Sequence, residues 1–76
     1  MDTEMKFDSL GTIWRGREIH VEACQPVGGK AVVTYVELGQ PPAVGYPDCG
    51  EYDTMVDALE AGLRWAIKQL SFRRVG

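Results

Sequence analysis

Residues 54–72 read TMVDALEAGLRWAIKQLSF, and this segment decides the fold because its apolar residues recur at the spacing of an amphipathic helix. Thr54 suits the N-cap, and Asp57 resembles the acidic partner of a capping box. Helical geometry predicts one apolar stripe, made of Met55, Val56, Leu59, Gly62, Leu63, Ala66, Ile67 and Leu70. It places a more polar set opposite that stripe, made of Asp57, Glu60, Ala61, Arg64 and Lys68.

Trp65 lies to one side of this stripe, near Ala58 and Phe72. Two interpretations are open. In the first, the indole extends the core of a small domain by packing against the loop around Tyr46. In the second, Ala58, Trp65 and Phe72 form an exposed surface for a protein partner or a second copy of the chain.

Residues 10–24, LGTIWRGREIHVEAC, are typical of a β-hairpin whose turn is Arg15-Gly16. That turn pairs Trp14 with Arg17 and predicts an alternation of faces along both strands. The inward face is expected to carry the apolar side chains of Leu10, Trp14, Ile19, Val21 and Ala23. The outward face is expected to carry Glu18, His20 and Glu22. Residues 1–9 are polar and predict a flexible lead-in.

Residues 31–38 are rich in β-branched side chains and predict a central strand. Strict alternation places Val32, Thr34, Val36 and Leu38 on one face, and Ala31, Val33, Tyr35 and Glu37 on the other. Residues 43–46 and 51–52 are candidate strand segments, interrupted by Pro47. The chain is therefore expected to be one α+β domain over residues 10–76, in which a three- to four-stranded antiparallel sheet is followed by one C-terminal amphipathic helix packed on one face (βββα).

The chain has 76 residues, a formal net charge of −3 and a pI of about 4.9. An acidic domain is repelled by phosphate backbones, and the outward sheet face adds Glu37 and Tyr35 to its other glutamates, which is the wrong charge for RNA. Nucleic-acid binding is therefore disfavoured. The possible phosphate contacts are the basic residues near the C-terminus, Arg64, Lys68, Arg73 and Arg74, which more simply complement the helix dipole.

The residues needed for catalysis or metal binding do not form a recognisable set. His20 is the single histidine, and Cys24 lies four residues away, which is about 13 Å along a strand. No CxxC spacing links Cys24 and Cys49, which are expected to be reduced. We assign no catalytic, metal or cofactor-binding residue. The N-terminus has no signal-peptide pattern and no segment has the length of a membrane span, so a cytoplasmic location without membrane association is expected.

The order strand, strand, strand, helix resembles short uncharacterised bacterial proteins of the Burkholderia type. The resemblance is carried by the hairpin and helix positions Trp14, Gly16, Ile19, Val21, Thr54, Ala58 and Gly62. It implies no activity. Residues 45–50 and the capped helix also resemble, more weakly, the HicB-type antitoxin domain, a partial RNase H-like sheet with a helix. That resemblance implies an acidic domain that sequesters a small basic toxin.

Together these features predict a small non-enzymatic protein-interaction module whose partner is a protein, and which is a monomer or a weak homodimer. The alternatives are a nucleic-acid-binding module that uses the basic end of the helix, and a HicB-like antitoxin. A small hydrolase using His20 and an acid is the least favoured hypothesis.

Overall fold

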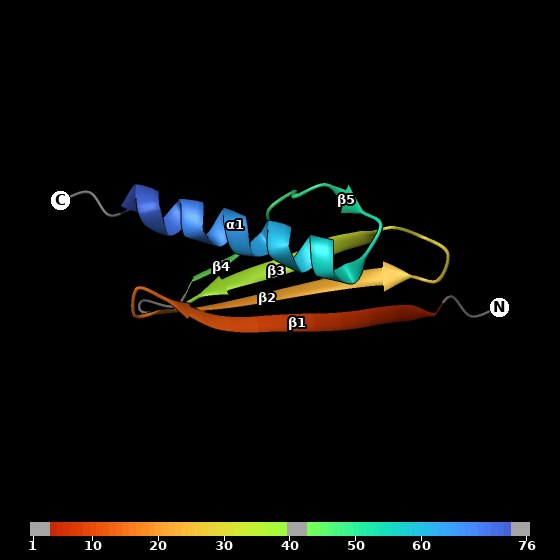
Figure 1. Cartoon of the computed structure of the whole chain (residues 1–76), viewed down its shortest axis with the longest axis horizontal. Coiled ribbons are helices and arrows are strands. Elements are labelled where there is room, and N and C mark those ends of the chain that lie inside the picture. The colour runs from red at the N-terminus through yellow and green to blue at the C-terminus, as the bar shows by residue number, and fades with distance from the viewer. Residues whose placement is uncertain (1–3, 40–42, 74–76) are drawn as a thin grey trace.

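An antiparallel sheet with one helix across one of its faces forms the described part of the chain, residues 4–39 and 43–73 of a computed structural model. The elements are β1 (Met5–Trp14), β2 (Arg17–Pro26), β3 (Ala31–Leu38), β4 (Ala43–Gly45), β5 (Glu51–Tyr52) and α1 (Met55–Arg73). The strands run in the order β1-β2-β3, and β4 and β5 both pair with β3. Figure 1 shows α1 lying over this sheet. The predicted α+β class, with its C-terminal helix on one face, is confirmed.

The β1–β2 hairpin has the predicted register, with Trp14 opposite Arg17. Its two turn residues have φ angles of 51° (Arg15) and 79° (Gly16), the left-handed conformation that a two-residue hairpin turn needs at both positions. The Arg15 guanidinium lies 4.7 Å from the Trp14 ring centroid, a cation–π contact that helps to hold the non-glycine residue there.

β1 begins at Met5, so the predicted flexible lead-in is wrong for residues 5–9. Residues 1–3 lie outside the described part of the chain. The sequence signal was weak here because Lys6, Asp8 and Ser9 are polar and β1 has solvent on much of both faces. Pairing with residues 22–26 of β2 makes this segment a strand, a tertiary effect that overrides local preference.

A β-bulge in the β2–β3 pairing changes the predicted faces of β3. Glu22 lies opposite Tyr35 while Ala23 lies opposite Val33, which leaves Thr34 as an extra residue. The Thr34 hydroxyl donates a hydrogen bond of 3.0 Å to the Glu22 carbonyl at this point. Strict alternation therefore fails at Thr34, and the face toward α1 carries Ala31, Val33, Val36 and Leu38. The prediction that Val32 shares the face of Val36 is wrong.

The sheet ends on one side in a short, broken edge. β4 and β5 pair with opposite ends of β3, and Pro47 and Gly50 lie between them. Gly50 has a φ of 89°, and its N–H donates to the Asp48 carboxylate at 3.2 Å. The Tyr52 hydroxyl donates to the Cys49 carbonyl at 2.7 Å. The candidate strand segments are thus present as β4 (residues 43–45) and β5 (residues 51–52), although β4 ends one residue before the predicted 46.

α1 begins after Thr54, whose hydroxyl accepts the Asp57 N–H at 3.1 Å, as the predicted N-cap requires. The buried face of the helix is rotated from the predicted stripe. Ala58 and Ala61 are buried, whereas Val56 is 62% exposed. The rotation brings Trp65 over β4, where a Cβ built on Gly45 would lie 2.8 Å from the indole Cη2. The core between helix and sheet contains Ile19, Val21, Ala23, Ala31, Val36, Leu38, Ala58, Leu59, Ala66 and Leu70.

Candidate interaction surface

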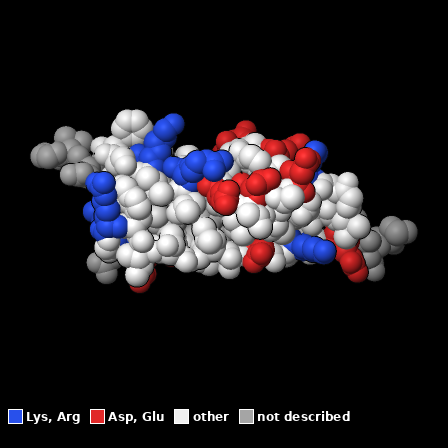
Figure 2. Space-filling view, viewed as in Figure 1, with Lys and Arg blue, Asp and Glu red and all other residues white. Residues whose placement is uncertain are grey.

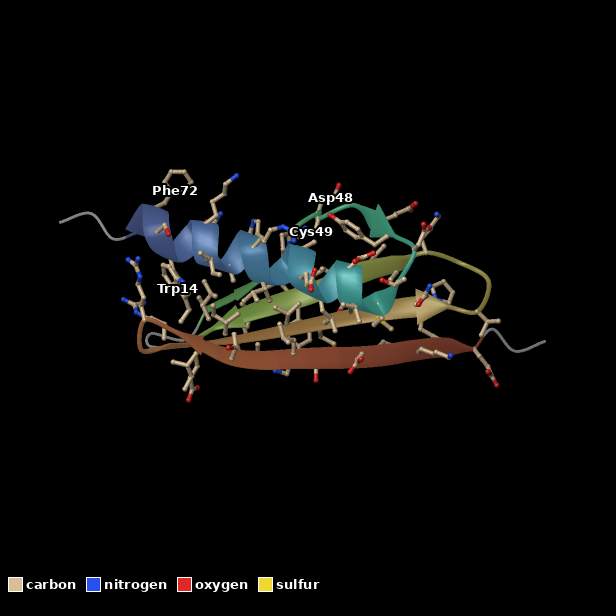
Figure 3. All side chains as sticks on the ribbon, in the orientation of Figure 1. Trp14, Asp48, Cys49 and Phe72 are labelled. Atoms are coloured by element: carbon tan, nitrogen blue, oxygen red, sulfur yellow. The ribbon has the colours of Figure 1, made fainter. Side chains whose placement is uncertain are left out.

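The predicted helix surface of Ala58, Trp65 and Phe72 does not exist as a continuous patch. Ala58 is fully buried in the core, and Trp65 is half-buried against Gly45. Phe72 alone is open, at 69% exposed, and it points away from the sheet in Figure 3. The packing therefore supports the interpretation that Trp65 extends the core. The alternative, a surface that includes Ala58, is wrong because Ala58 is buried.

Two of the predicted phosphate contacts, Arg64 and Lys68, are exposed on α1 and line an open groove of about 360 Å³. Asp48 and Cys49 lie on the other side of this groove (Figure 3). The Arg73 side chain and the whole of Arg74 lie outside the described part of the chain. In Figure 2 more of the Lys and Arg side chains lie over the half of the molecule that holds the hairpin turn and the C-terminal half of α1, and the others lie toward the opposite end.

The environment of Cys49 opposes its use as a nucleophile. Burial raises the pKa of the Cys49 thiol, the Asp48 carboxylate raises it further, and the Arg64 guanidinium partly lowers it. The reactive species of a cysteine is the thiolate, so this environment disfavours it at neutral pH. Cys24 lies on the opposite face of the sheet, next to Val32, and both thiols are free.

The neighbours of Cys49 predict how its alkylation depends on pH. In a Cys24→Ser background, we expect iodoacetamide to react with Cys49 with a rate midpoint above that of a free cysteine. Asp48→Asn should move this midpoint to lower pH and Arg64→Ala to higher pH, because the carboxylate raises the thiol pKa and the guanidinium lowers it. Mass spectrometry of the alkylated fraction over a pH series measures the midpoint. Identical midpoints in all three proteins would contradict the described groove.

The face of the sheet opposite α1 is left open by the elements of the described chain (Figure 1). Side chains of the two inner strands, β2 and β3, meet on it: His20 pairs with Glu37, and Glu22 with Tyr35. Val44 lies opposite Glu37. Tyr46 directly follows β4, and its phenol is near enough to Tyr35 to raise the pKa of that residue. We call this set the tyrosine patch and define it as His20, Glu22, Tyr35, Glu37, Val44 and Tyr46.

Aromatic rings and carboxylates are close together in the tyrosine patch. The rings of His20 and Tyr35 have centroids 5.8 Å apart and are tilted by 32°. Desolvation and the Glu22 carboxylate raise the pKa of the Tyr35 phenol, and Glu37 and Tyr46 contribute in the same direction. Tyr46 is 78% exposed, and Val44 is exposed as well. The patch therefore offers ring faces and apolar area beside negative charge.

The surface beside the tyrosine patch is hollowed toward the hairpin turn. This hollow, about 810 Å³, is lined by Gly11, Thr12, Ile13, Glu18, Ile19, His20, Glu37 and Gly39. Its charged lining residues are glutamates, which extends the acidic character of the patch. A ligand that fits this face carries positive charge.

The sequence predicted only part of this surface. It placed Glu18, His20, Glu22, Tyr35 and Glu37 on the outward face, and the structure has them there. It missed Val44 and Tyr46, because a three-residue strand flanked by prolines carries too short an alternation to assign a face.

Other kinds of site find little support among the described residues. No three His, Cys, Asp or Glu side chains within residues 4–39 and 43–73 are grouped as a metal site requires. In the same ranges, α1 is not apolar enough over its length to span a membrane. A scan against protein-family models, a search of the curated proteins and a search of the solved structures each found no match to this chain.

Proposed function

We propose that this domain is a small non-enzymatic protein-interaction module that binds a basic segment of another protein through the tyrosine patch. The observation that carries the proposal is the exposure of Tyr46 and Val44 beside the carboxylates of Glu22 and Glu37 on an open sheet face. Exposed apolar area of this kind, bordered by charge, is a common feature of protein-binding surfaces.

Arginine is the side chain that this patch suits best. A guanidinium stacks on the face of a tyrosine ring and forms paired hydrogen bonds to a carboxylate, and lysine does only part of this. Both kinds of group lie within the patch, since Tyr35 is directly opposite Glu22. The resemblance to HicB-type antitoxin domains implies a basic protein partner as well, and an antitoxin that sequesters a small basic toxin is one form of this proposal.

A defined peptide tests the proposal. We expect a labelled arginine-rich peptide to bind, by fluorescence anisotropy, more tightly than the lysine-rich peptide of the same length. Glu37→Lys should weaken binding by about tenfold, as the loss of a close charge pair predicts. Glu60→Lys is the matched control, because it makes the same charge change on the exposed side of α1.

Equal loss of affinity in Glu37→Lys and Glu60→Lys would contradict the proposal, because it would show binding to net charge alone. Backbone amide shifts in NMR spectra locate the peptide. Shifts centred on β2, β3 and β4 support the patch, and shifts centred on α1 reject it. Capture from the native cell with the wild-type protein and with Glu37→Lys then identifies which basic protein depends on the patch.

One observation favours the alternative, nucleic-acid binding: Arg64 and Lys68 are exposed in the half of the molecule where more of the basic side chains lie in Figure 2. Asp48 in the same groove opposes a phosphate there. A single-stranded RNA oligonucleotide in the same anisotropy assay separates the two functions. Salt-sensitive RNA binding that is lost in Arg64→Ala/Lys68→Ala and kept in Glu37→Lys would favour the alternative.

A further inference from the structure

We propose that β1 is a dimerisation edge, and that two copies of the chain pair through it in antiparallel orientation to form one continuous sheet. This proposal does not rest on the tyrosine patch. It starts from β1 itself, a ten-residue strand at the edge of the sheet that pairs with β2 without a bulge. A long, regular edge strand presents a row of free backbone donors and acceptors to another chain.

The hairpin turn decides which backbone groups of β1 are free. Trp14 and Arg17 flank a two-residue turn and so form a hydrogen-bonded pair. Because such pairs alternate along an antiparallel ladder, the backbone N–H and C=O groups of the even-numbered residues of β1 point toward β2. The Val27 N–H donates to the Glu4 carbonyl at 3.1 Å, in agreement with this alternation. The backbone N–H and C=O groups of the odd-numbered residues therefore point to the open edge. The Ser9 N–H is one of these, and it donates instead to the Asp8 carboxylate at 2.8 Å.

The two edges of the sheet are protected very differently. The β4–β5 edge is short and is broken by Pro47 and the left-handed Gly50. β1 has none of these devices, and Lys6 is its single lysine. Two large apolar side chains of β1 point away from α1 and are open to solvent, Phe7 at 64% and Ile13 at 67% exposed. These features favour association at β1 and oppose it at the other edge.

The side chains select a register. With the two-fold axis at Leu10, Phe7 lies opposite Ile13 of the second copy, and Ile13 opposite Phe7, so the exposed apolar side chains of β1 cover one another. Odd-numbered residues then meet odd-numbered residues, as the free hydrogen-bonding groups require. On the other face of the sheet, Lys6 lies opposite Trp14 of the second copy, a cation–π pair.

Charge identifies a second copy of this chain as the occupant. In this register Glu4 lies opposite the hairpin turn of the second copy, next to Arg15. On the face drawn in Figure 2, more of the Lys and Arg side chains lie over the half with the hairpin turn, and most of the Asp and Glu side chains lie over the middle and the opposite half. Antiparallel pairing forms the contact between Glu4 and the turn of the second copy once at each end of the interface, so this complementarity is satisfied twice.

Sedimentation equilibrium or light scattering over a concentration series tests the dimer. We expect the wild-type protein to approach twice the chain mass as its concentration rises. Phe7→Glu should shift the mass toward the monomer, because it places a carboxylate at the interface opposite Ile13. Ser9→Pro should do the same, because it removes an edge N–H that the β2 ladder does not use. Phe72→Glu is the matched control, with an equally exposed phenylalanine on α1, and should keep the wild-type mass.

The register is tested by charge rescue. The double variant Phe7→Glu/Ile13→Lys should restore the dimer that Phe7→Glu loses, because the introduced carboxylate and ammonium lie opposite each other twice across the two-fold axis. A wild-type monomer at every concentration, or a dimer that Phe7→Glu and Ser9→Pro leave intact, would overturn the proposal. If Phe7→Glu and Ser9→Pro both lose the dimer but Phe7→Glu/Ile13→Lys does not restore it, the proposed register would be overturned. Glu37→Lys should not alter the measured mass, so the dimer proposal can fail without affecting the proposed function of the tyrosine patch, and the reverse.

Discussion

Gly62→Ala is expected to lower the free energy of unfolding by about 1–2 kcal/mol, although alanine is the better helix former. A Cβ at this position would lie 2.5 Å from Val21 Cγ1 and 3.3 Å from Val33 Cγ2. Both valines project from central strands of the sheet. Val21 is fully buried and Val33 partly buried, so the Val21 methyl group, which is the nearer one, has no free space to move into. A contact of 2.5 Å places the overpacking cost in the upper part of the usual range, at about 2–3 kcal/mol, and the gain of about 1 kcal/mol in helix propensity offsets only part of it.

Urea unfolding followed by circular dichroism measures the effect of Gly62→Ala. Gly11→Ala is the control, because a Cβ on Gly11 would meet no atom within 4 Å. We expect that control to be neutral or slightly stabilising. In a Val21→Ala background the Gly62→Ala change should cost much less, because the contacting methyl groups are gone. An equal cost in both backgrounds would refute close approach of α1 to β2 as the cause.

Trp65→Ala is expected to lower the free energy of unfolding by about 2–3 kcal/mol, below the 3–5 kcal/mol of a fully buried tryptophan because the indole is half-buried. The ring packs against the core and lies over Gly45, where only a glycine leaves room for it. Losing the ring uncovers β4, which is held otherwise by its short pairing with β3. Amide hydrogen exchange should therefore rise most in β4.

Phe72→Ala provides the comparison for Trp65→Ala, since it removes another aromatic ring from the same helix. Phe72 is largely exposed, and the expected change in unfolding free energy is within about 0.5 kcal/mol. Similar destabilisation by the two substitutions would contradict the described packing. A stable Trp65→Ala protein with unchanged exchange in β4 would show that the indole belongs to a surface and not to the core.

The hairpin and the start of the helix were predicted correctly from local sequence patterns. Alternation between Leu10 and Ala23, with a glycine in the turn, predicted the register of β1 and β2 residue by residue. The cap at Thr54 predicted where α1 begins. Both signals are local, since a turn and a cap each involve residues a few positions apart. The start of β1 at Met5 was missed, because it depends on pairing with a distant strand segment, residues 23–26.

The candidate interaction surface was predictable in its charge and not in its composition. Glutamates that alternate with inward apolar residues on β2 indicate an acidic outer face from sequence alone. Which face Trp65 and Tyr46 join depends on how α1 is rotated and on where β4 docks. The sequence therefore left two interpretations of Trp65 open, an extension of the core or a helix surface with Ala58 and Phe72. The open aromatic area lies instead across the sheet, at Tyr35 and Tyr46.

The sequence by itself determined the elements, their order, the hairpin register and the acidic balance of this protein, because each follows from spacing, turn chemistry or composition. Tertiary structure alone decided three further features: the bulge at Thr34, the rotation of α1 toward Trp65, and the extent of the β1 edge. The reason is common to all three. A strand changes face, a helix turns and an edge is extended when packing against distant residues lowers the free energy more than local preference does. The C-terminal helix is thus a local property of residues 54–72, and the side of it that the sheet covers is not.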